Sequence, residues 1–169
     1  MDQKFLNWLL KLRNKPMNHI MIFITHLGTG AFIWLLFSLI FFIKDQKILT
    51  YRILLALVVN ALVCNLTLKP LLKRRRPSWI DKIELLIKNP TDFSFPSGHA
   101  SSSFAAATTI FSQNQSFGTF CLILAGLIAF SRLYHFVHYP SDVLIGSFLG
   151  ICMAQISRLL FNKYLLFLL

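Results

Sequence analysis

Long apolar runs alternate with short polar segments along nearly the whole chain. A helix that crosses a lipid bilayer needs about 20 mostly apolar residues to span a hydrocarbon core of roughly 30 Å, and several runs reach that length. We expect five spans, over residues 17–43, 48–72, 98–113, 117–137 and 142–168. The pattern predicts an all-α fold, a polytopic membrane helix bundle that forms one domain over residues 1–169.

Small residues mark two places within these spans. Gly28 and Gly30 interrupt the first apolar run, so we expect the first helix to bend there or to let a neighbouring helix approach closely. The run at 98–113 is rich in Ser, Ala and Thr. Such a composition suits a helix packed inside the bundle rather than one facing lipid.

Two segments outside the spans are amphipathic. Residues 1–15 mix Leu, Phe and Trp with Lys and Arg, which predicts a helix lying at the membrane interface; the alternative is an extension of the first span. No small-residue cleavage site follows, and this argues against a removed signal peptide. Residues 78–95 are mixed in polarity and predict an extramembrane loop that carries a short surface helix over 80–87.

Composition narrows the classes of partner. Hydrophobic residues make up 56% of the chain and the mean hydropathy is +0.63, too apolar for a soluble domain of this size. The net charge of +11 suits nucleic acid, anionic lipid or a phosphorylated substrate, and a membrane location favours the last two over nucleic acid. The three cysteines lie in apolar runs, so we infer neither a disulfide nor a metal site from them.

Alternation of the spans places one set of polar residues on the same side of the membrane. The set consists of Lys69, Arg76, Ser97, Gly98, His99, Arg132, His138 and Asp142. Basic residues at span ends are often interfacial anchors, and we expect that role for Lys73, Arg74 and Arg75. We expect His19 and His26, in the first span, to be structural.

Three blocks of this set have a distinctive order and spacing. Lys69 and Arg76 are separated by six residues and followed by proline; the sequence Pro-Ser-Gly-His ends at His99; and Ser131-Arg132 is followed by His138 and then Asp142. These blocks resemble the signature of the type 2 phosphatidic acid phosphatase (PAP2) family, KxxxxxxRP, PSGH and SRxxxxxHxxxD. The resemblance is tight over residues 69–142, and its spacing selects His138 rather than His135.

The resemblance implies which residues form the active site. It assigns phosphate binding to Lys69, Arg76, Ser97, Gly98 and Arg132, and catalysis to His99, His138 and Asp142. Charge supports this division, because a phosphate monoester carries about −1.5 to −2 charges that cations and a helix N-terminus can balance.

The mechanism implied for this site is covalent. Neutral His138 attacks phosphorus and forms a phosphohistidine, while Asp142 orients the ring through its other nitrogen. His99 protonates the leaving oxygen and then takes a proton from the hydrolytic water. The sequence offers no HExxH pattern and no Cys/His ligand set, so we expect a metal-independent enzyme without a cofactor.

A non-catalytic lipid-binding protein and a transporter are the alternatives to an enzyme. A non-catalytic membrane protein that binds anionic lipid would explain the basic residues 73–76 but not the two histidines and the aspartate. A transporter would place its polar groups near the bilayer midplane, whereas these lie at one face. The apolar spans exclude the soluble acid phosphatases and vanadium haloperoxidases of the same superfamily.

Substrate and orientation are less constrained. Small bacterial-looking members of the family resemble undecaprenyl diphosphate phosphatases and phosphatidylglycerophosphate phosphatases; polyprenyl diphosphate is the first choice, and phosphatidylglycerophosphate or phosphatidic acid the alternative. The resemblance places the active site on the outer face of a bacterial cytoplasmic membrane. Charge counting opposes this, because twelve of the seventeen Lys and Arg lie on the active-site side, which favours the cytoplasmic side. The sequence does not determine the oligomeric state.

Overall fold

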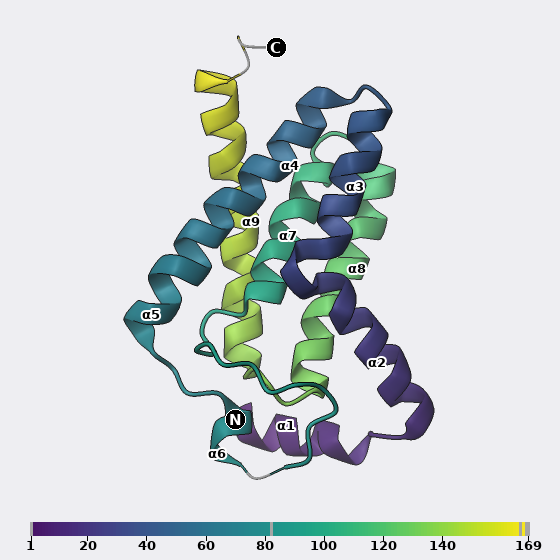
Figure 1. Ribbon diagram of the computed structural model, residues 1–169, viewed down its shortest axis with the longest axis vertical. Helices are drawn as coiled ribbons and strands as arrows, with labels where there is room; N and C mark the ends of the chain where they lie inside the picture. The colour runs from purple at the N-terminus through teal and green to yellow at the C-terminus, as the bar shows by residue number, and fades with distance from the viewer. Residues whose placement is uncertain (1, 82, 166, 168–169) are drawn as a thin grey trace.

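The computed structural model describes residues 2–81, 83–165 and 167, and within these residues it contains helices and no strands. Figure 1 shows the helices as a bundle with α1 and the long loop at one end. The elements in chain order are α1 Asp2–Lys11, α2 Lys15–Gly28, the 3₁₀ turn η1 Thr29–Ala31, α3 Phe32–Ile43, α4 Lys47–Asn60, the π-helical η2 Ala61–Leu68, α5 Lys69–Leu72, α6 Pro77–Ile80, α7 Gly98–Phe111, α8 Gln115–Tyr134 and α9 Pro140–Tyr164.

Four helical segments are long and apolar enough to cross a membrane. They are Lys15–Ile43, Lys47–Ile80, Gln115–Tyr134 and Pro140–Tyr164. Many of their large apolar side chains are exposed, including Phe23, Leu66 and Phe148, as expected for surfaces that face lipid rather than water. The chain is therefore an integral-membrane helix bundle.

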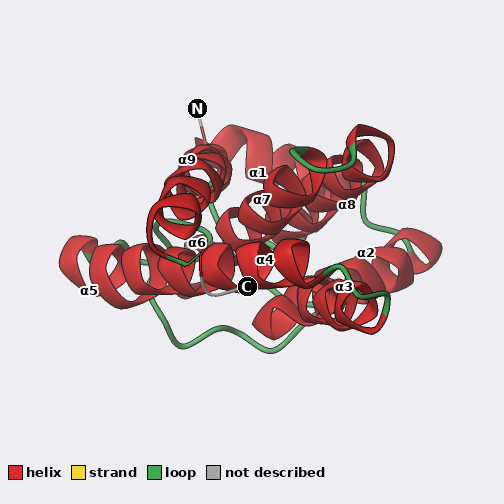
Figure 2. Cartoon of the chain, turned by 90° about the horizontal axis from the view of Figure 1, so that it is seen from above, coloured by secondary structure: helices red, strands yellow, loops and turns green. Residues whose placement is uncertain are grey.

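The fifth expected span, residues 98–113, is α7. At 14 residues it is about 21 Å long, shorter than the hydrocarbon core, so the count of five spans is not confirmed. Eight residues of α7 are buried, most of them Ala or Ser, and α7 packs against α4, α8 and α9 (Figure 2). Its small side chains make it the central helix of the bundle.

Close packing between α7 and α9 depends on a glycine. A Cβ atom added at Gly150 would lie 2.3 Å from the carbonyl oxygen of Ser101 and 3.0 Å from the amide nitrogen of Ala105. Only a residue without a side chain permits this approach of the two backbones. The middle of α9 is thereby held beside the first half of α7.

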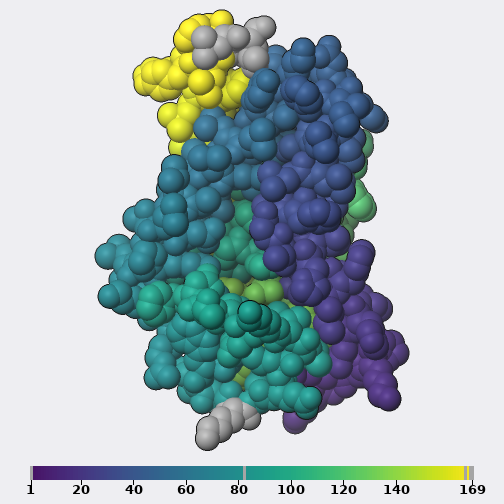
Figure 3. Space-filling view, viewed as in Figure 1, coloured from purple at the N-terminus to yellow at the C-terminus, as the bar shows by residue number. Residues whose placement is uncertain are grey.

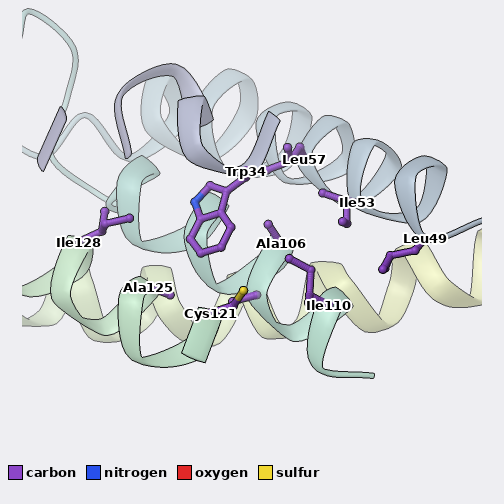
Figure 4. Close-up of a cluster of buried hydrophobic side chains, with 10 residues drawn as sticks. Trp34, Leu49, Ile53, Leu57, Ala106, Ile110, Cys121, Ala125 and Ile128 are labelled. Carbon is purple, nitrogen blue, oxygen red and sulfur yellow. The ribbon is translucent and has the colours of Figure 1, made fainter. Parts of the chain in front are cut away.

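The apolar core lies between α3, α4, α7 and α8 (Figure 4). Trp34 is fully buried there and packs with Ile53, Ala106 and Cys121. Its indole Nε1 donates a hydrogen bond to the Ser103 hydroxyl at 3.0 Å, which satisfies the single polar atom of the side chain. This core packs α7 against α3, α4 and α8.

The first span bends where the glycines predict. Gly30 and Ala31 have φ of +58° and +59°, a backbone conformation that ends α2 and starts α3 in a new direction. Gly28, just before the bend, lies against α7 and α8, because an added Cβ would meet Ile128 and His99 at 2.6 and 2.8 Å. The bend thus brings the first span against the start of α7.

The N-terminal helix α1 lies across one end of the bundle (Figure 1). It is separate from α2 rather than an extension of it, and it buries Leu6 and Leu9 while Trp8 is 52% exposed. Arg13, just after α1, donates hydrogen bonds to the carbonyl oxygens of Glu84 and Tyr134 at 3.0 and 2.9 Å. These contacts tie α1 to the loop and to the end of α8.

The loop after the second span differs from its prediction. Its short helix is α6, Pro77–Ile80, and the described residues of 81–87 are not helical, so the expected helix over 80–87 is wrong. Proline at the first helical position favours a helix start at Pro77. The last helix is described from Pro140 to Tyr164, and the expected end at residue 168 falls outside the described residues.

Candidate active site

The eight predicted site residues come from five parts of the chain that meet at the end of the bundle nearest α1. Lys69 starts α5 and Arg76 precedes α6; Ser97, Gly98 and His99 start α7; Arg132 lies in the last turn of α8; and His138 and Asp142 flank the start of α9. All of them except Gly98 and His99 are less than 9% exposed. The convergence expected from alternating spans is present.

Arg76 is at the centre of the cluster and is only 2% exposed. Its Nη1 lies 3.0 Å from Nε2 of His138 and donates to the carbonyl oxygen of Val137 at 2.7 Å. A guanidinium has only donors, so Nε2 of His138 must be the acceptor and carry the lone pair. The ring proton therefore sits on Nδ1.

His138 is held in its neutral form. Burial, and then the positive charges of Arg76, Arg132 and Lys69, lower the pKa of His138 well below its ordinary value. Its Nδ1 faces Asp142, with 3.5 Å between Nδ1 and Oδ2. A neutral imidazole with its lone pair on Nε2 and a carboxylate near its protonated nitrogen has the tautomer of an activated nucleophile.

Asp142 is fully buried and held by its own helix start. Its Oδ2 accepts a hydrogen bond from the backbone amide of Tyr139 at 2.9 Å, as part of a capping box. Its Oδ1 accepts one from Nη1 of Arg74 at 2.6 Å. The expectation that Arg74 serves only as an interfacial anchor is therefore wrong, because this cation pairs with the carboxylate beside His138.

The start of α7 approaches Lys69 closely. The Ser97 hydroxyl caps the helix by accepting from the amide of Ala100 at 3.5 Å, and the Ser97 amide donates to the carbonyl oxygen of Asp142 at 3.1 Å. A Cβ at Gly98 would lie 2.7 Å from Oδ1 of Asn65 and 3.5 Å from Nζ of Lys69. The glycine thus lets the free amides of this helix start lie beside a cation.

Arg132 and His99 both reach the first span. Nη1 of Arg132 donates to the hydroxyl of Thr25 at 2.6 Å, and Nε2 of His99 lies 3.5 Å from the hydroxyl of Thr29. Arg132 is 4% exposed and has no carboxylate partner among the residues described. An anion would be the natural partner for this buried charge.

Asp92 joins two of the cations. Its carboxylate pairs with Lys69 through one oxygen and with Nη2 of Arg76, at 2.7 Å, through the other. Burial acts to raise the pKa of Asp92, but the hydrogen bonds and charges of Lys69 and Arg76 outweigh it and lower this pKa to about 2. Asp92 is thus ionised at any physiological pH.

Sequence reasoning missed Arg74, Asp92 and Asn65. Arg74 is a variable position inside the first signature block, and Asn65 and Asp92 lie outside all three blocks. Asn65 comes from η2, whereas Asp92 comes from the loop between α6 and α7. The other histidines lie apart from the cluster: His19 bonds Lys15 through Nδ1, and His135 packs edge-on against Tyr134. In the described part of the chain, no group of three His, Cys, Asp or Glu side chains could hold a metal ion.

A cavity of about 490 Å³ opens beside the cluster. Figure 3 shows the hollow between α4 and the bent first span, with α7 at its floor. Its polar end is lined by Asn65, Lys69, Asp92, Gly98 and His99. Its other end is apolar, lined by Ala31, Leu35, Leu54, Leu57 and Val58. The cavity can therefore hold a molecule with an anionic head and an apolar tail.

This fold and site define a membrane phosphatase. Residues 49–165 match the PAP2 superfamily, and the chain belongs to it. It is 29% identical to the undecaprenyl-diphosphatase of Sulfolobus acidocaldarius over 83% of this chain and 69% of that protein. It is 28% identical to the undecaprenyl-diphosphatase BcrC of Bacillus subtilis over 89% of this chain and 80% of that protein.

A solved structure shares the fold. The transmembrane PAP2-type phosphatidylglycerolphosphate phosphatase of Bacillus subtilis superposes with a TM-score of 0.77 at 24% identity, over 98% of this chain and 87% of that chain. At this identity the likeness concerns the arrangement of the helices. It supports the same arrangement of helices over nearly the whole chain.

Proposed function

We propose that this protein is a metal-independent lipid phosphate phosphatase that acts through a phosphohistidine at His138. One observation carries the proposal: Nε2 of His138, buried and unprotonated, lies 3.0 Å from a guanidinium that also belongs to a cluster of cations. An uncharged nucleophilic nitrogen beside positive charge is what attack on a phosphate dianion requires.

The first half of the proposed reaction forms the phosphoenzyme. The phosphate enters among Lys69, Arg76, Arg132 and the amides at Gly98, which balance the charge on its three equatorial oxygens. Nε2 attacks phosphorus, the bond to the leaving oxygen breaks, and His99 supplies the proton that oxygen takes. Burial and the nearby cations lower the pKa of His99 in the empty site, and the negative charge of a bound phosphate opposes this lowering, so His99 takes up its proton with the substrate. Asp142 stabilises the positive charge on the ring of His138 through Nδ1.

The second half of the reaction hydrolyses the phosphohistidine and regenerates the free enzyme. His99, now neutral, takes a proton from a water molecule, whose oxygen attacks phosphorus and displaces Nε2. Orthophosphate then leaves among the same cations. Fixed cations supply the charge stabilisation, so the proposed steps need no metal ion and no cofactor.

We propose polyprenyl diphosphate as the substrate. Two relatives named undecaprenyl-diphosphatase support this choice, and the cavity, polar at Lys69 and apolar at Leu54 and Val58, suits a phosphate with a long hydrocarbon tail. Phosphatidylglycerophosphate is the second candidate, supported by a further relative, the phosphatidylglycerophosphatase B of Bacillus subtilis. We propose a bacterial cytoplasmic membrane as the location of the enzyme.

Phosphate release by the purified chain tests the proposal. The chain is assayed in detergent with EDTA on undecaprenyl diphosphate, phosphatidylglycerophosphate and phosphatidic acid. We expect release from the first to be fastest, and to fall at least 10³-fold in His138→Ala, since loss of a nucleophile removes the covalent route. His135→Ala is the matched control, because that ring is equally buried three residues away; it should retain activity.

Three results would contradict parts of the proposal. Activity unchanged in His138→Ala would exclude this nucleophile. Loss of activity in EDTA that a divalent metal restores would exclude the metal-independent mechanism. Binding of anionic lipid vesicles without release from any lipid would favour a non-catalytic lipid-binding protein.

A further inference from the structure

Asp92 lies on the open side of the phosphate-binding cations. Its side chain is 53% exposed, whereas the side chains of its two partners, Lys69 and Arg76, are 9% and 2% exposed. It also lines the cavity through which a phosphate would enter. Of the three groups, the carboxylate is the one that can turn toward water with little loss of solvation.

The contacts of Asp92 resemble those that a phosphate would make. Each carboxylate oxygen pairs with a different cation, as two equatorial oxygens of a phosphoryl group would. The same guanidinium contacts Nε2 of His138. A phosphate placed for attack by this nitrogen would therefore need the donors that Asp92 occupies.

The backbone at Asp92 is held independently of its side chain. Nε of Arg76 donates to the carbonyl oxygen of Asp92 at 2.7 Å, and Nη2 lies 3.3 Å from that of Phe93. On either side, Trp79 bonds the carbonyl of Pro90 and the amide of Ser94 bonds that of Arg74. Rotation of one side chain would free both cations without opening the loop.

We propose that Asp92 is an internal competitor of phosphate, occupying Lys69 and Arg76 until the substrate displaces it and returning as the product leaves. The inference rests on the proposed function, because it takes these two cations as phosphate ligands. In the empty enzyme the carboxylate offsets the charge of two buried cations. With product bound, its return weakens the hold on orthophosphate and so limits product inhibition.

Inhibition by orthophosphate tests this role. The full chain is assayed in detergent with EDTA on undecaprenyl diphosphate, with orthophosphate as competitor. We expect Asp92→Asn to lower the inhibition constant of orthophosphate about ten-fold, the usual scale for one charge-assisted hydrogen bond, and to lower KM with it. Asp92→Glu keeps the negative charge, so its inhibition constant for orthophosphate should stay within about three-fold of the wild-type value. Asp45→Asn, at an exposed aspartate in another loop, should change nothing.

The opposite result has a clear meaning. If Asp92 instead positions the cations for substrate, Asp92→Asn will raise KM and the inhibition constant, and the inference is overturned; an unchanged constant overturns it as well. The rise in melting temperature with orthophosphate gives a second readout, which should be larger in Asp92→Asn. The shift in melting temperature needs no turnover. If the wild-type protein released no phosphate, the proposed function would be contradicted, but the shift would still test whether Asp92 competes with orthophosphate.

Discussion

The guanidinium of Arg74 lies 2.6 Å from the buried carboxylate of Asp142. Arg74 also bonds the hydroxyl of Ser141 at 2.9 Å and lies over the ring of Tyr139, with its central carbon 4.2 Å from the ring centroid. Arg74 thus fixes one oxygen of Asp142, while the other faces His138. A residue that touches the nucleophile's partner rather than the substrate is a positioning residue.

Arg74→Ala is expected to lower kcat about ten-fold and to change KM little, because it loosens Asp142 and hence the ring of His138. Arg75→Ala is the matched control, since its side chain is exposed and adjacent in sequence, and it should stay within about two-fold of wild type. Steady-state kinetics on the same lipid checks both. Equal effects of the two substitutions would mean that Arg74 acts only through surface charge.

Gly98→Ala is expected to lower kcat/KM by at least ten-fold. The new Cβ would lie 2.7 Å from Oδ1 of Asn65, so either the start of α7 or the asparagine must move, and shifts of this size at a reacting centre are costly. Gly126→Ala, where a Cβ meets nothing within 4 Å, is the control and should keep full activity. Full activity in Gly98→Ala would remove the argument that close approach is needed here.

Gly150→Ala is expected to destabilise the bundle by about 1–3 kcal/mol, the usual range for overpacking. Its Cβ would meet backbone atoms of α7, at Ser101 and Ala105, which cannot rotate away. Thermal unfolding in detergent gives the comparison, with Gly126→Ala expected to be neutral or slightly stabilising because alanine favours a helix. A melting temperature of Gly150→Ala equal to that of wild type would show that the two helices can separate freely.

Acidification is expected to destabilise the protein through His135. Burial lowers the pKa of His135 to about 4, below the unfolded value near 6.5, so the unfolded chain binds more protons between these values. Stability from this group is present above pH 6.5 and falls by about 2 kcal/mol on going to pH 5. The melting temperature should fall less between pH 7.5 and pH 5.0 in His135→Asn than in the wild-type protein. An equal fall in the two proteins would assign the effect to other groups.

Much of the fold follows from the sequence because lipid imposes simple rules. Apolar length indicates the long helices, and Gly28 and Gly30 mark the bend of the first span. Residues 98–113 are a different case: the sequence predicts a helix there with small side chains that suit the bundle interior, and α7 runs from Gly98 to Phe111, but its assignment as a fifth span is not confirmed. Polarity alone does not separate an internal helix from a short span.

The site divides in the same way. The resemblance to the PAP2 signature named His99, Arg132 and His138, and each sits at or next to a helix end on the face that span alternation predicts. Arg74 and Asp92 could not, because their contacts depend on tertiary structure: Asp92 lies 16 residues from Arg76 and meets it only through the fold of the loop. Three consecutive arginines in the sequence do not show which side chains point into the protein. In the structure Arg74 and Arg76 point toward the site, whereas Arg75 is exposed.

The most direct test of the central claim is to trap the phosphoenzyme. Purified chain is mixed with undecaprenyl diphosphate labelled in the terminal phosphate and quenched with alkaline detergent, which preserves phosphohistidine, and the labelled residue is located by peptide mapping. We expect label on His138 in wild type and none in His138→Ala, while His135→Ala is labelled like wild type. Label that persists in His138→Ala, or that maps to another residue, would contradict the account.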